Sequence, residues 1–591
     1  MTSTSKPIWI GLGIAAIAFH TWLIFSGLIP NLVSRPLHMA LALPWVFLFE
    51  SAGGWHRRTG FVLTIIGIAC CGYIALNETA LSDQYGFLNS TPQILIAGAL
   101  LGLTLEMARR VVGWPLPVIA FLFLLYGLFG QHIPGEFGHP GVPLNSFLGT
   151  LVITEGGLWG KLTGVSVSVV AVFVIFGAVL NAGEAGQGFM NVAIAAAGRL
   201  KGGAAKVSVL SSALFGSISG SASANVASTG MVTLPTMAKL GYPKRIAGAV
   251  EAVASTGGQI MPPLMGAGAF VMVELTGIPY TEIILAASIP AILYFLTIWI
   301  GVNAYADRYD LQPYRADMQP AFAEVIKTTL FFLVPFSALL FVMFSGFTPQ
   351  FAASIASLVA TALLFTGTDG RIDLSRAGQR LITVSLFAGK QIAMIAAIIL
   401  CASIIVGILG MTGLGVKITS TILSLAGNGL WMALGLTALA CIVLGMEVPT
   451  TAAYVICVSV AGPALIDLGI APLVVHLFIF WYALLSTITP PVCGGVFIAA
   501  SMVGENWLRV AISAMLLGLG LYIIPLAFIR HPALLDLGSS TQASMLAALQ
   551  VSVGLGFLGH GLIGPRPVWQ RLGLSAIGLV VIFVTWPSLG A

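Results

Sequence analysis

Long apolar stretches, separated by short polar connections, run along most of the chain. The first five lie within residues 1–130 and are Ile8–Ile29, Leu37–Phe49, Gly60–Leu76, Gln93–Met107 and Pro115–Gly130. The strands of a membrane barrel alternate apolar and polar residues, whereas these stretches are continuously apolar. A helix needs about 20 apolar residues to cross a bilayer, so the chain has room for roughly fifteen to eighteen crossings. The pattern predicts an all-α polytopic membrane protein.

Three segments of different character divide the later part of the chain. Gln131–Pro143 is typical of an external loop, Leu144–Leu162 of an amphipathic segment at the membrane interface, and Asp369–Arg380 of a basic loop. Further apolar stretches that we expect to be helices are Val165–Ala182, Ile283–Val302, Lys327–Phe344, Phe351–Phe365, Met545–Leu562 and Leu572–Trp586.

Composition and charge agree with this class. Only 8% of the residues are charged, whereas a soluble chain has about 25%. The pairs Arg57-Arg58 and Arg109-Arg110 flank apolar stretches, and the connection Asn77–Asn89 has acids but no Lys or Arg. The positive-inside rule therefore places the N-terminus and both arginine pairs in the cytoplasm. The six cysteines have no metal-ligand spacing, which favours small buried residues.

Two polar, glycine-rich breaks bound the stretch Leu214–Phe270. Residues 216–225 read GSISGSASAN, and residues 255–263 read STGGQIMPP. A membrane protein tolerates broken backbone at depth only where protein shields it or where it lines a cavity. Carbonyls, hydroxyls and helix N-termini at such breaks are the parts from which transporters build ion and anion sites.

A second copy of this pattern follows. Gly445 corresponds to Gly216 (445 − 216 = 229), and Pro490-Pro491 corresponds to Pro262-Pro263 (490 − 262 = 228). We therefore expect two repeats with re-entrant hairpins and broken helices. The predicted divisions are 1–140 for an N-terminal helical module, 141–310 for the first repeat, 311–380 for bridging spans, 381–530 for the second repeat and 531–591 for C-terminal scaffold spans.

The polar groups at the breaks suit a monovalent cation. Residues 216–225 include four serines and an asparagine but no acid, and divalent sites usually recruit carboxylates. We predict one cation site per repeat, formed by Gly216, Ser217, Ser219 and Thr256 in the first and by Gly445, Thr450, Thr487 and Thr489 in the second. No Lys or Arg lies within either break, so we expect an anionic substrate to contact Ser221, Asn225 and Thr451.

Two acids fall inside the core motifs. An acid at the centre of a membrane helix costs about 2.5–3.5 kcal/mol on insertion scales and is a functional candidate by default. Glu251 and Glu447 therefore either take part in proton coupling or bond the backbone of a hairpin. His476 is alone in an apolar run, and we interpret it as structural.

Several motifs resemble the permeases of TRAP transporters (tripartite ATP-independent periplasmic transporters). They are residues 216–225, 248–252 (GAVEA), 255–263 and 266–270 (GAGAF). The resemblance covers about residues 93–310 strongly and 380–510 moderately. Residues 105–110 (LEMARR) are a further motif of this kind. With this motif included, the chain most resembles the fused permeases that serve TAXI-type binding proteins.

The resemblance implies a fold and a function. The fold would be an elevator-type transport domain and a scaffold that includes an N-terminal small-subunit-like module. The function would be secondary active uptake of small organic acids, such as dicarboxylates or glutamate-like anions, across the bacterial inner membrane. A periplasmic TAXI-type binding protein would deliver the substrate, and a cation gradient, usually sodium, would drive uptake without a further cofactor.

Two alternatives remain open at this point, whereas an enzyme and a pump are disfavoured. Glu251 and Glu447 keep a proton-coupled transporter of the same architecture open, and a channel is a less favoured reading. An enzyme would need a nucleophile with a base or a metal constellation, and we expect none because the core serines have no histidine in the same stretch. A pump driven by ATP would need a phosphate-binding loop, and the sequence has no such motif.

Overall fold

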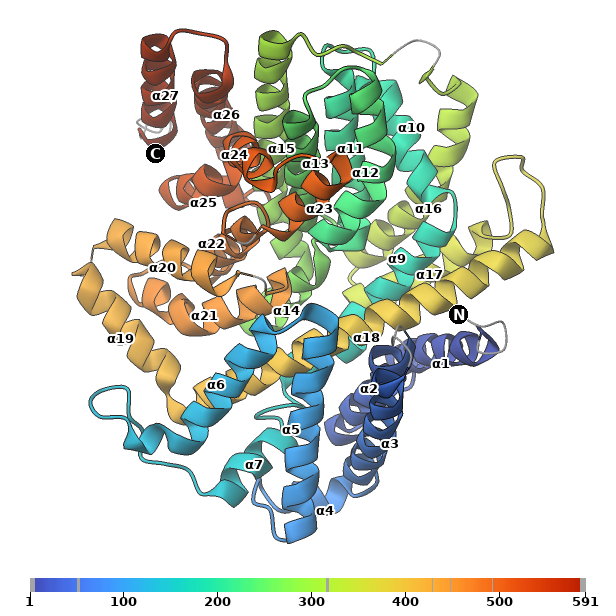
Figure 1. The fold of residues 1–591 in the computed structure, drawn as a ribbon, viewed down its shortest axis with the longest axis vertical. Coiled ribbons are helices and arrows are strands. Elements are labelled where there is room, and N and C mark those ends of the chain that lie inside the picture. Colours follow the sequence, from blue (N-terminus) through green and yellow to red (C-terminus); the bar gives the residue numbers. More distant parts are fainter. Residues whose placement is uncertain are drawn as a thin grey trace. The chain divides into compact units, whose positions relative to one another are not determined.

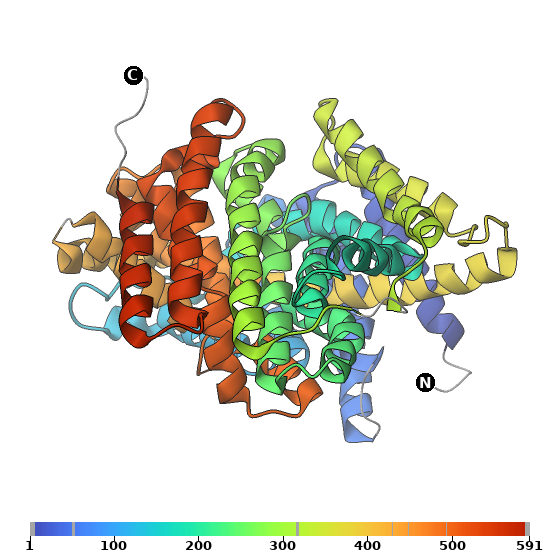
Figure 2. The ribbon, with the colours of Figure 1, turned by 90° about the horizontal axis from the view of Figure 1, so that it is seen from above.

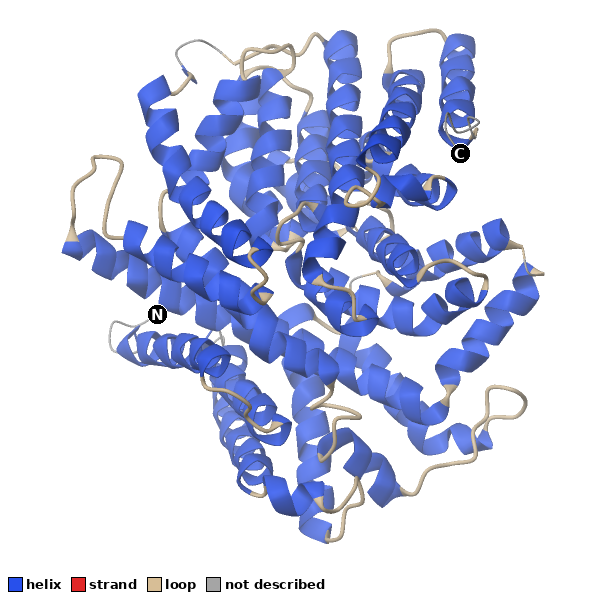
Figure 3. Cartoon of the chain, turned by 180° about the vertical axis from the view of Figure 1, so that it is seen from behind, coloured by secondary structure: helices blue, strands red, loops and turns tan. Residues whose placement is uncertain are grey.

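The structure is a computed structural model that describes residues 6–49, 54–314, 318–427, 429–446, 448–491 and 493–584. Within these ranges the chain is helical throughout, with one isolated bridge between Thr366 and Ile372 and no strand (Figure 3). Eleven of the described helices are long and apolar enough to cross a membrane, and eight shorter apolar helices have 10–17 residues. The all-α polytopic class is confirmed. The eleven long helices are fewer than the fifteen to eighteen crossings expected, because many apolar stretches are broken into short helices.

The chain forms two compact units, each built from two separate segments. Unit 1 comprises residues 1–183 and 334–469, and unit 2 comprises residues 184–333 and 470–591. Helix α16 (Phe322–Phe344) belongs partly to each. The five divisions predicted from the sequence remain predictions.

Unit 1 is organised around the 39-residue helix α18 (Leu374–Thr412), which contacts α1, α2, α5, α6, α9 and α21 (Figure 1). Its buried face includes Ala396 and Leu400 and packs with Phe47 and Trp159 in one apolar core. The other helices of unit 1 are α1 (Lys6–Phe25), α2 (Asn31–Pro44), η2 (Trp45–Phe49), α3 (Trp55–Leu76), α4 (Glu78–Ser82), α5 (Thr91–Val112), α6 (Pro115–Phe129), η3 (Gly130–His132), α7 (Leu144–Val152), α8 (Lys161–Val165), η4 (Ser166–Val170), α9 (Ala171–Ala182), α17 (Pro349–Leu363), α19 (Leu414–Ala426), α20 (Leu430–Leu444) and α21 (Thr450–Asp467).

The predicted loop Asp369–Arg380 is wrong beyond residue 373, where α18 begins. The Asp373 side chain caps the helix by accepting hydrogen bonds from the backbone N–H groups of Ser375, at 2.9 Å, and Arg376, at 3.0 Å. An acid at this position also faces the positive end of the helix dipole. The charged residues that follow therefore form the first turns of a helix.

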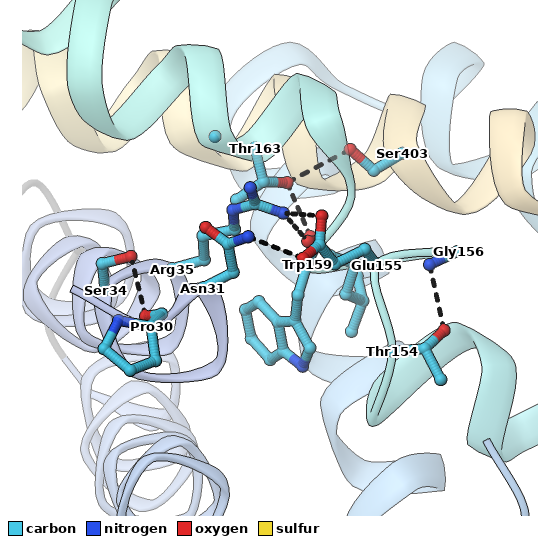
Figure 4. A network of polar contacts seen from close by, with 12 residues as sticks. Pro30, Asn31, Ser34, Arg35, Thr154, Glu155, Gly156, Trp159, Thr163 and Ser403 are labelled. Atoms are coloured by element: carbon cyan, nitrogen blue, oxygen red, sulfur yellow. Dashed lines mark hydrogen bonds and ion pairs between the residues drawn. The ribbon is translucent and has the colours of Figure 1, made fainter. Parts of the chain in front are cut away.

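A polar network that is buried at Arg35 and Trp159 and exposed at Glu155 ties α2 to the connection between α7 and α8 within unit 1 (Figure 4). Arg35 donates to the backbone carbonyl of Trp159 and lies 3.4 Å from the Glu155 carboxylate, and Asn31 donates to the same carboxylate at 2.6 Å. A Cβ on Gly164 would lie 2.9 Å from the Arg35 guanidinium, so glycine makes room for that side chain. The N-terminal helices are thus joined to later segments by buried charge as well as by apolar packing.

Unit 2 contains both breaks of the first copy and the proline pair of the second copy. Its longest helix, α15 (Tyr280–Tyr309), packs against α26 (Thr541–Ile563), which in turn packs against α27 (Val568–Phe583) (Figure 2). The other helices of unit 2 are α10 (Ala185–Ala197), α11 (Gly203–Ser219), α12 (Ala222–Lys239), α13 (Lys244–Gly257), η5 (Gly258–Ile260), α14 (Gly266–Thr276), α22 (Pro472–Leu484), η7 (Leu485–Thr487), α23 (Gly494–Val503), α24 (Trp507–Leu517), α25 (Gly520–Arg530) and η8 (Pro532–Leu535).

Candidate functional site

The first polar break is a tight turn between α11 and α12. Gly220 ends α11 with φ +60°, a conformation that residues with a side chain rarely adopt. Ser221 then caps α12, because its hydroxyl oxygen accepts a hydrogen bond from the backbone N–H of Ala224 at 3.3 Å. The break predicted from the serines and glycines is therefore confirmed, and it leaves the N-terminus of a helix at the turn.

The second break follows α13. After the short helix η5 the chain is irregular until α14 begins at Gly266. The peptide bond between Pro262 and Pro263 is cis, and so is the bond between Pro490 and Pro491.

The two breaks touch each other through backbone. A Cβ on Gly216 would lie 2.3 Å from the Cα of Gly258, and a Cβ on Gly220 would lie 2.8 Å from the Cα of Gly266. The Gln259 side chain donates a hydrogen bond to the Gly220 carbonyl at 3.0 Å. Glycine is thus required where α11 crosses the end of α13, and the crossing brings carbonyl groups of both breaks into one region.

Asn225 lies beside this crossing with an unsatisfied acceptor. Its amide nitrogen donates to the carbonyls of Ser212, at 2.9 Å, and Ser255, at 3.3 Å, which fixes the orientation of the amide. Its side-chain oxygen is buried and has no hydrogen-bond partner within the described part of the chain. A buried acceptor without a partner costs about 1–3 kcal/mol, so the site favours a donor or a cation there.

Glu251 is fully buried and surrounded by hydroxyl groups from three helices. Ser208 donates to its Oε2 at 2.8 Å, Ser255 to its Oε1 at 3.3 Å, and Thr229 and Thr233 donate to Oε1 and Oε2, respectively. A weaker contact at 3.5 Å comes from Ser212 of α11. No salt bridge to this carboxyl group exists among the described residues.

Thr256 and Thr487, which we predicted to be cation ligands in different repeats, lie together in unit 2. Their hydroxyl oxygens are 3.0 Å apart. Each also lies within 2.8 Å of a carbonyl of its own helix, that of Ala252 or Leu484. When both protons point to these carbonyls, the two oxygens face each other with lone pairs available to a cation.

A comparison with protein-family models decides the family. Residues 100–543 match the DctM component of the tripartite ATP-independent periplasmic transporters. The chain belongs to this family. It is a multi-pass membrane transport protein of the bacterial inner membrane.

Three relatives illustrate the range of similar permeases. The chain is 27% identical to the C4-dicarboxylate TRAP transporter large permease protein DctM of Pseudomonas aeruginosa over 56% of this chain and 76% of the relative. It is 24% identical to the sialic acid large permease SiaM of Vibrio cholerae over 58% and 79%. It is 27% identical to the isethionate permease DctMQ of Oleidesulfovibrio alaskensis over 40% and 32%.

The other predicted site residues of this TRAP permease are distributed over both units. Ser217 donates back to the Leu214 carbonyl at 2.7 Å, and the Thr489 hydroxyl lies 2.7 Å from the hydroxyl of Tyr522 in unit 2. The side chain of Ser219 and the whole of Glu447 lie outside what the structure describes. In unit 1, Gly445 follows α20, and Thr450 and Thr451 begin α21. Of the second predicted site, Gly445 and Thr450 thus fall in unit 1, and Thr487 and Thr489 fall in unit 2.

The hydroxyl groups around Glu251 were missed from the sequence, although a signal exists. Ser208 and Ser212 are four residues apart, as are Thr229 and Thr233, so each pair occupies one face of a helix. Glu251 and Ser255 have the same spacing. Three apolar helices with a polar pair at i and i+4 indicate a shared polar centre, because each pair needs partners in the membrane.

Proposed function

We propose that this TRAP permease is a secondary active transporter that takes up small organic acids, with dicarboxylates or glutamate-like anions as the expected class. Support comes from its family and from relatives named for C4-dicarboxylate, sialic acid and isethionate. A periplasmic binding protein of the TAXI type delivers the substrate, and the N-terminal helices act as a fused small subunit. The two breaks act as re-entrant hairpins of an elevator-type domain.

Sodium is the coupling ion that the geometry favours. The observation that carries this proposal is the unpartnered side-chain oxygen of Asn225 beside the backbone crossing of Gly216 and Gly258. Neutral carbonyl, amide and hydroxyl oxygens suit Na⁺ at broken helices. We therefore move Asn225 from the substrate to the cation, because an oxygen that can only accept repels a carboxylate. Ser221 and the N-terminus of α12 remain candidates for the substrate anion.

The paired hydroxyls of Thr256 and Thr487 complete a second set of neutral oxygens. Each is bonded to its own helix, so its proton is turned away and its lone pairs remain available. In unit 1, Gly445 at the end of α20 and Thr450 at the start of α21 remain predicted cation ligands of the second repeat. Thr451 remains a predicted contact of the substrate.

Uptake into proteoliposomes tests the proposal. The purified permease, a TAXI-type binding protein and a radiolabelled dicarboxylate are combined with an imposed sodium or proton gradient. We expect uptake that requires both the binding protein and inward sodium. Uptake without the binding protein would contradict the tripartite assignment, and uptake without sodium would contradict the coupling ion.

Thr256→Ala provides a sharper test of the sodium site. We expect it to raise the sodium concentration needed for half-maximal uptake about tenfold, which corresponds to about 1.4 kcal/mol. Thr297→Ala is the matched control, because Thr297 is also buried in unit 2 and also bonds its own helix, at 2.7 Å from the Leu293 carbonyl. Equal effects of both substitutions would show that Thr256 acts through structure.

Proton coupling through Glu251 is the second candidate. The hydroxyls of Thr229 and Thr233 lie 2.8 and 3.0 Å from carbonyls of their own helix, which gives them a second acceptor. When Glu251 is ionised they donate to it, and when it is protonated they turn back to α12. The site can thus satisfy both protonation states. Glu251→Gln should abolish uptake driven by protons and leave uptake driven by sodium, with the exposed Glu274→Gln as control.

A further inference from the structure

A basic pocket of about 420 Å³ lies within unit 1, far in the sequence from both breaks. It is formed where η2, α3, α5 and α18 meet. The lining residues that define its chemistry are Trp45, Phe49, His56, Arg109, Arg110 and Lys390. No acid is among the lining residues that the structure describes.

The two arginines share one carboxylate and keep hydrogen-bond donors available. Arg109 holds both oxygens of Glu106 at 2.6 and 2.8 Å, and Arg110 donates to one of them at 2.7 Å. A further nitrogen of Arg110 donates to the Phe47 carbonyl at 3.2 Å. This leaves Nη1 of Arg109 and Nη2 of Arg110 without a partner in the described ranges. Two guanidinium groups against one carboxylate give this part of the pocket a net positive charge.

The indole of Trp45 adds a second and independent observation. Its N–H is buried and has no hydrogen-bond partner among the described residues. The ring is held firmly, since it packs 4.8 Å from the ring of Phe49, and a Cβ on Gly389 would lie 2.3 Å from the indole. A buried donor without a partner costs about 1–3 kcal/mol. Together with the guanidinium donors, it calls for a ligand that only accepts hydrogen bonds.

The pocket also has the features of the headgroup region of a membrane. The positive-inside rule places Arg109 and Arg110, in the last turn of α5, on the cytoplasmic side. Trp55 and Trp114 are exposed at 75% and 64% near this end, as interfacial tryptophans are. The remaining lining includes apolar groups such as Met394, against which a hydrocarbon chain can pack.

We propose that this pocket binds the phosphate group of an anionic glycerophospholipid from the cytoplasmic leaflet. The free guanidinium nitrogens of Arg109 and Arg110 and the Trp45 indole donate to the phosphate oxygens. Lys390 adds positive charge, and an acyl chain follows the apolar side of the pocket. Because the lipid then contacts η2, α5 and α18 at once, it stabilises the junction of the N-terminal helices with the long helix of unit 1. Basic pockets on the cytoplasmic side of membrane helices bind anionic headgroups in this way.

Lipid binding to the purified full-length permease tests the proposal. The protein is delipidated in a neutral detergent and titrated with phosphatidylglycerol, phosphatidylcholine or inorganic phosphate, and bound lipid is counted by native mass spectrometry. We expect one phosphatidylglycerol bound in preference to phosphatidylcholine. Competition by inorganic phosphate at equal concentration would assign the pocket to a soluble anion instead. Equal binding of both lipids would overturn the proposal.

Three variants locate the lipid. Lys390→Gln and Trp45→Phe should each weaken phosphatidylglycerol binding about fivefold, the effect of one lost charge or polar contact at a membrane surface. Trp45→Phe keeps an aromatic ring but removes the N–H group together with part of the indole, so Lys390→Gln is the variant that leaves the packing of the Trp45 ring unchanged. The control Arg57→Gln/Arg58→Gln removes two exposed charges on the same predicted side. Loss of binding only in this control would place the lipid outside the pocket.

Discussion

Single glycine residues decide how closely the two breaks approach. A methyl group at Gly216 would meet the Cα of Gly258, which is backbone and cannot turn away. At Gly494, which follows the proline pair of the second copy, a Cβ would have nothing within 4 Å. The same change of residue therefore has different consequences at two glycines that border the breaks.

Gly216→Ala should destabilise unit 2 by about 1–3 kcal/mol, because overpacking forces the backbone of α11 away from α13. Gly494→Ala is the matched control and should change stability by less than about 0.5 kcal/mol. Thermal unfolding of both variants in the same detergent measures the difference. Equal midpoints would mean that α11 and α13 do not cross at these glycines.

Glu251 provides a second prediction at the scale of the residue. Glu251→Ala should destabilise the fold by about 3 kcal/mol, because it leaves a cavity and removes the acceptor of the Ser208 hydroxyl. Glu251→Gln keeps an acceptor and similar volume, so it should remain within about 1 kcal/mol of the wild type. Reversible unfolding in mixed micelles compares the two. A strongly destabilised glutamine variant would show that the hydroxyls require the charge.

At the scale of the element, most of the helices could be predicted because their boundaries are set by local chemistry. The apolar stretch Gly60–Leu76 became α3, and Pro115–Gly130 became α6 with nearly the same bounds. The hydroxyl groups around Glu251 could not be predicted in the same way, because their meeting depends on which faces of α11, α12 and α13 turn toward one another. The orientation of these faces follows from long-range packing, which hydrophobic periodicity and composition do not encode.

The Asp373 cap contributes to the stability of the first turn of helix α18. Asp373→Ala removes the acceptor of two backbone N–H groups and should destabilise the first turn by about 1 kcal/mol. Asp373→Asn retains a capping oxygen and should lose only a fraction of this amount. Hydrogen exchange at residues 375–378 measures local opening. Unchanged exchange in the alanine variant would contradict the role of this cap.

At the scale of the whole molecule, unit 1 joins residues that are distant in sequence. Besides the network of Figure 4, His20 and His38 lie 2.7 Å apart through ring nitrogens, and His38 lies 3.0 Å from the Ser166 hydroxyl. His20 Nδ1 contacts the Ala16 carbonyl, which can only accept a hydrogen bond. When both rings are neutral, His20 Nδ1 therefore donates to Ala16, His38 Nδ1 donates to His20 Nε2, and the Ser166 hydroxyl donates to His38 Nε2. Together with the contacts of Arg35, these hydrogen bonds connect α2 to segments beyond residue 150.

A chain divided in the exposed loop between Gly135 and Glu136 should therefore reassemble. We expect residues 1–135 and 136–591, expressed together, to co-purify through a tag on either fragment and to support uptake. Arg35→Ala should weaken co-purification, because it removes the donor to the Trp159 carbonyl and one of the two donors to the Glu155 carboxylate. Arg57→Ala, at an exposed position, is the control. Fragments that separate with the wild-type sequence would show that the covalent connection, and not the buried contacts of unit 1, holds the N-terminal helices in place.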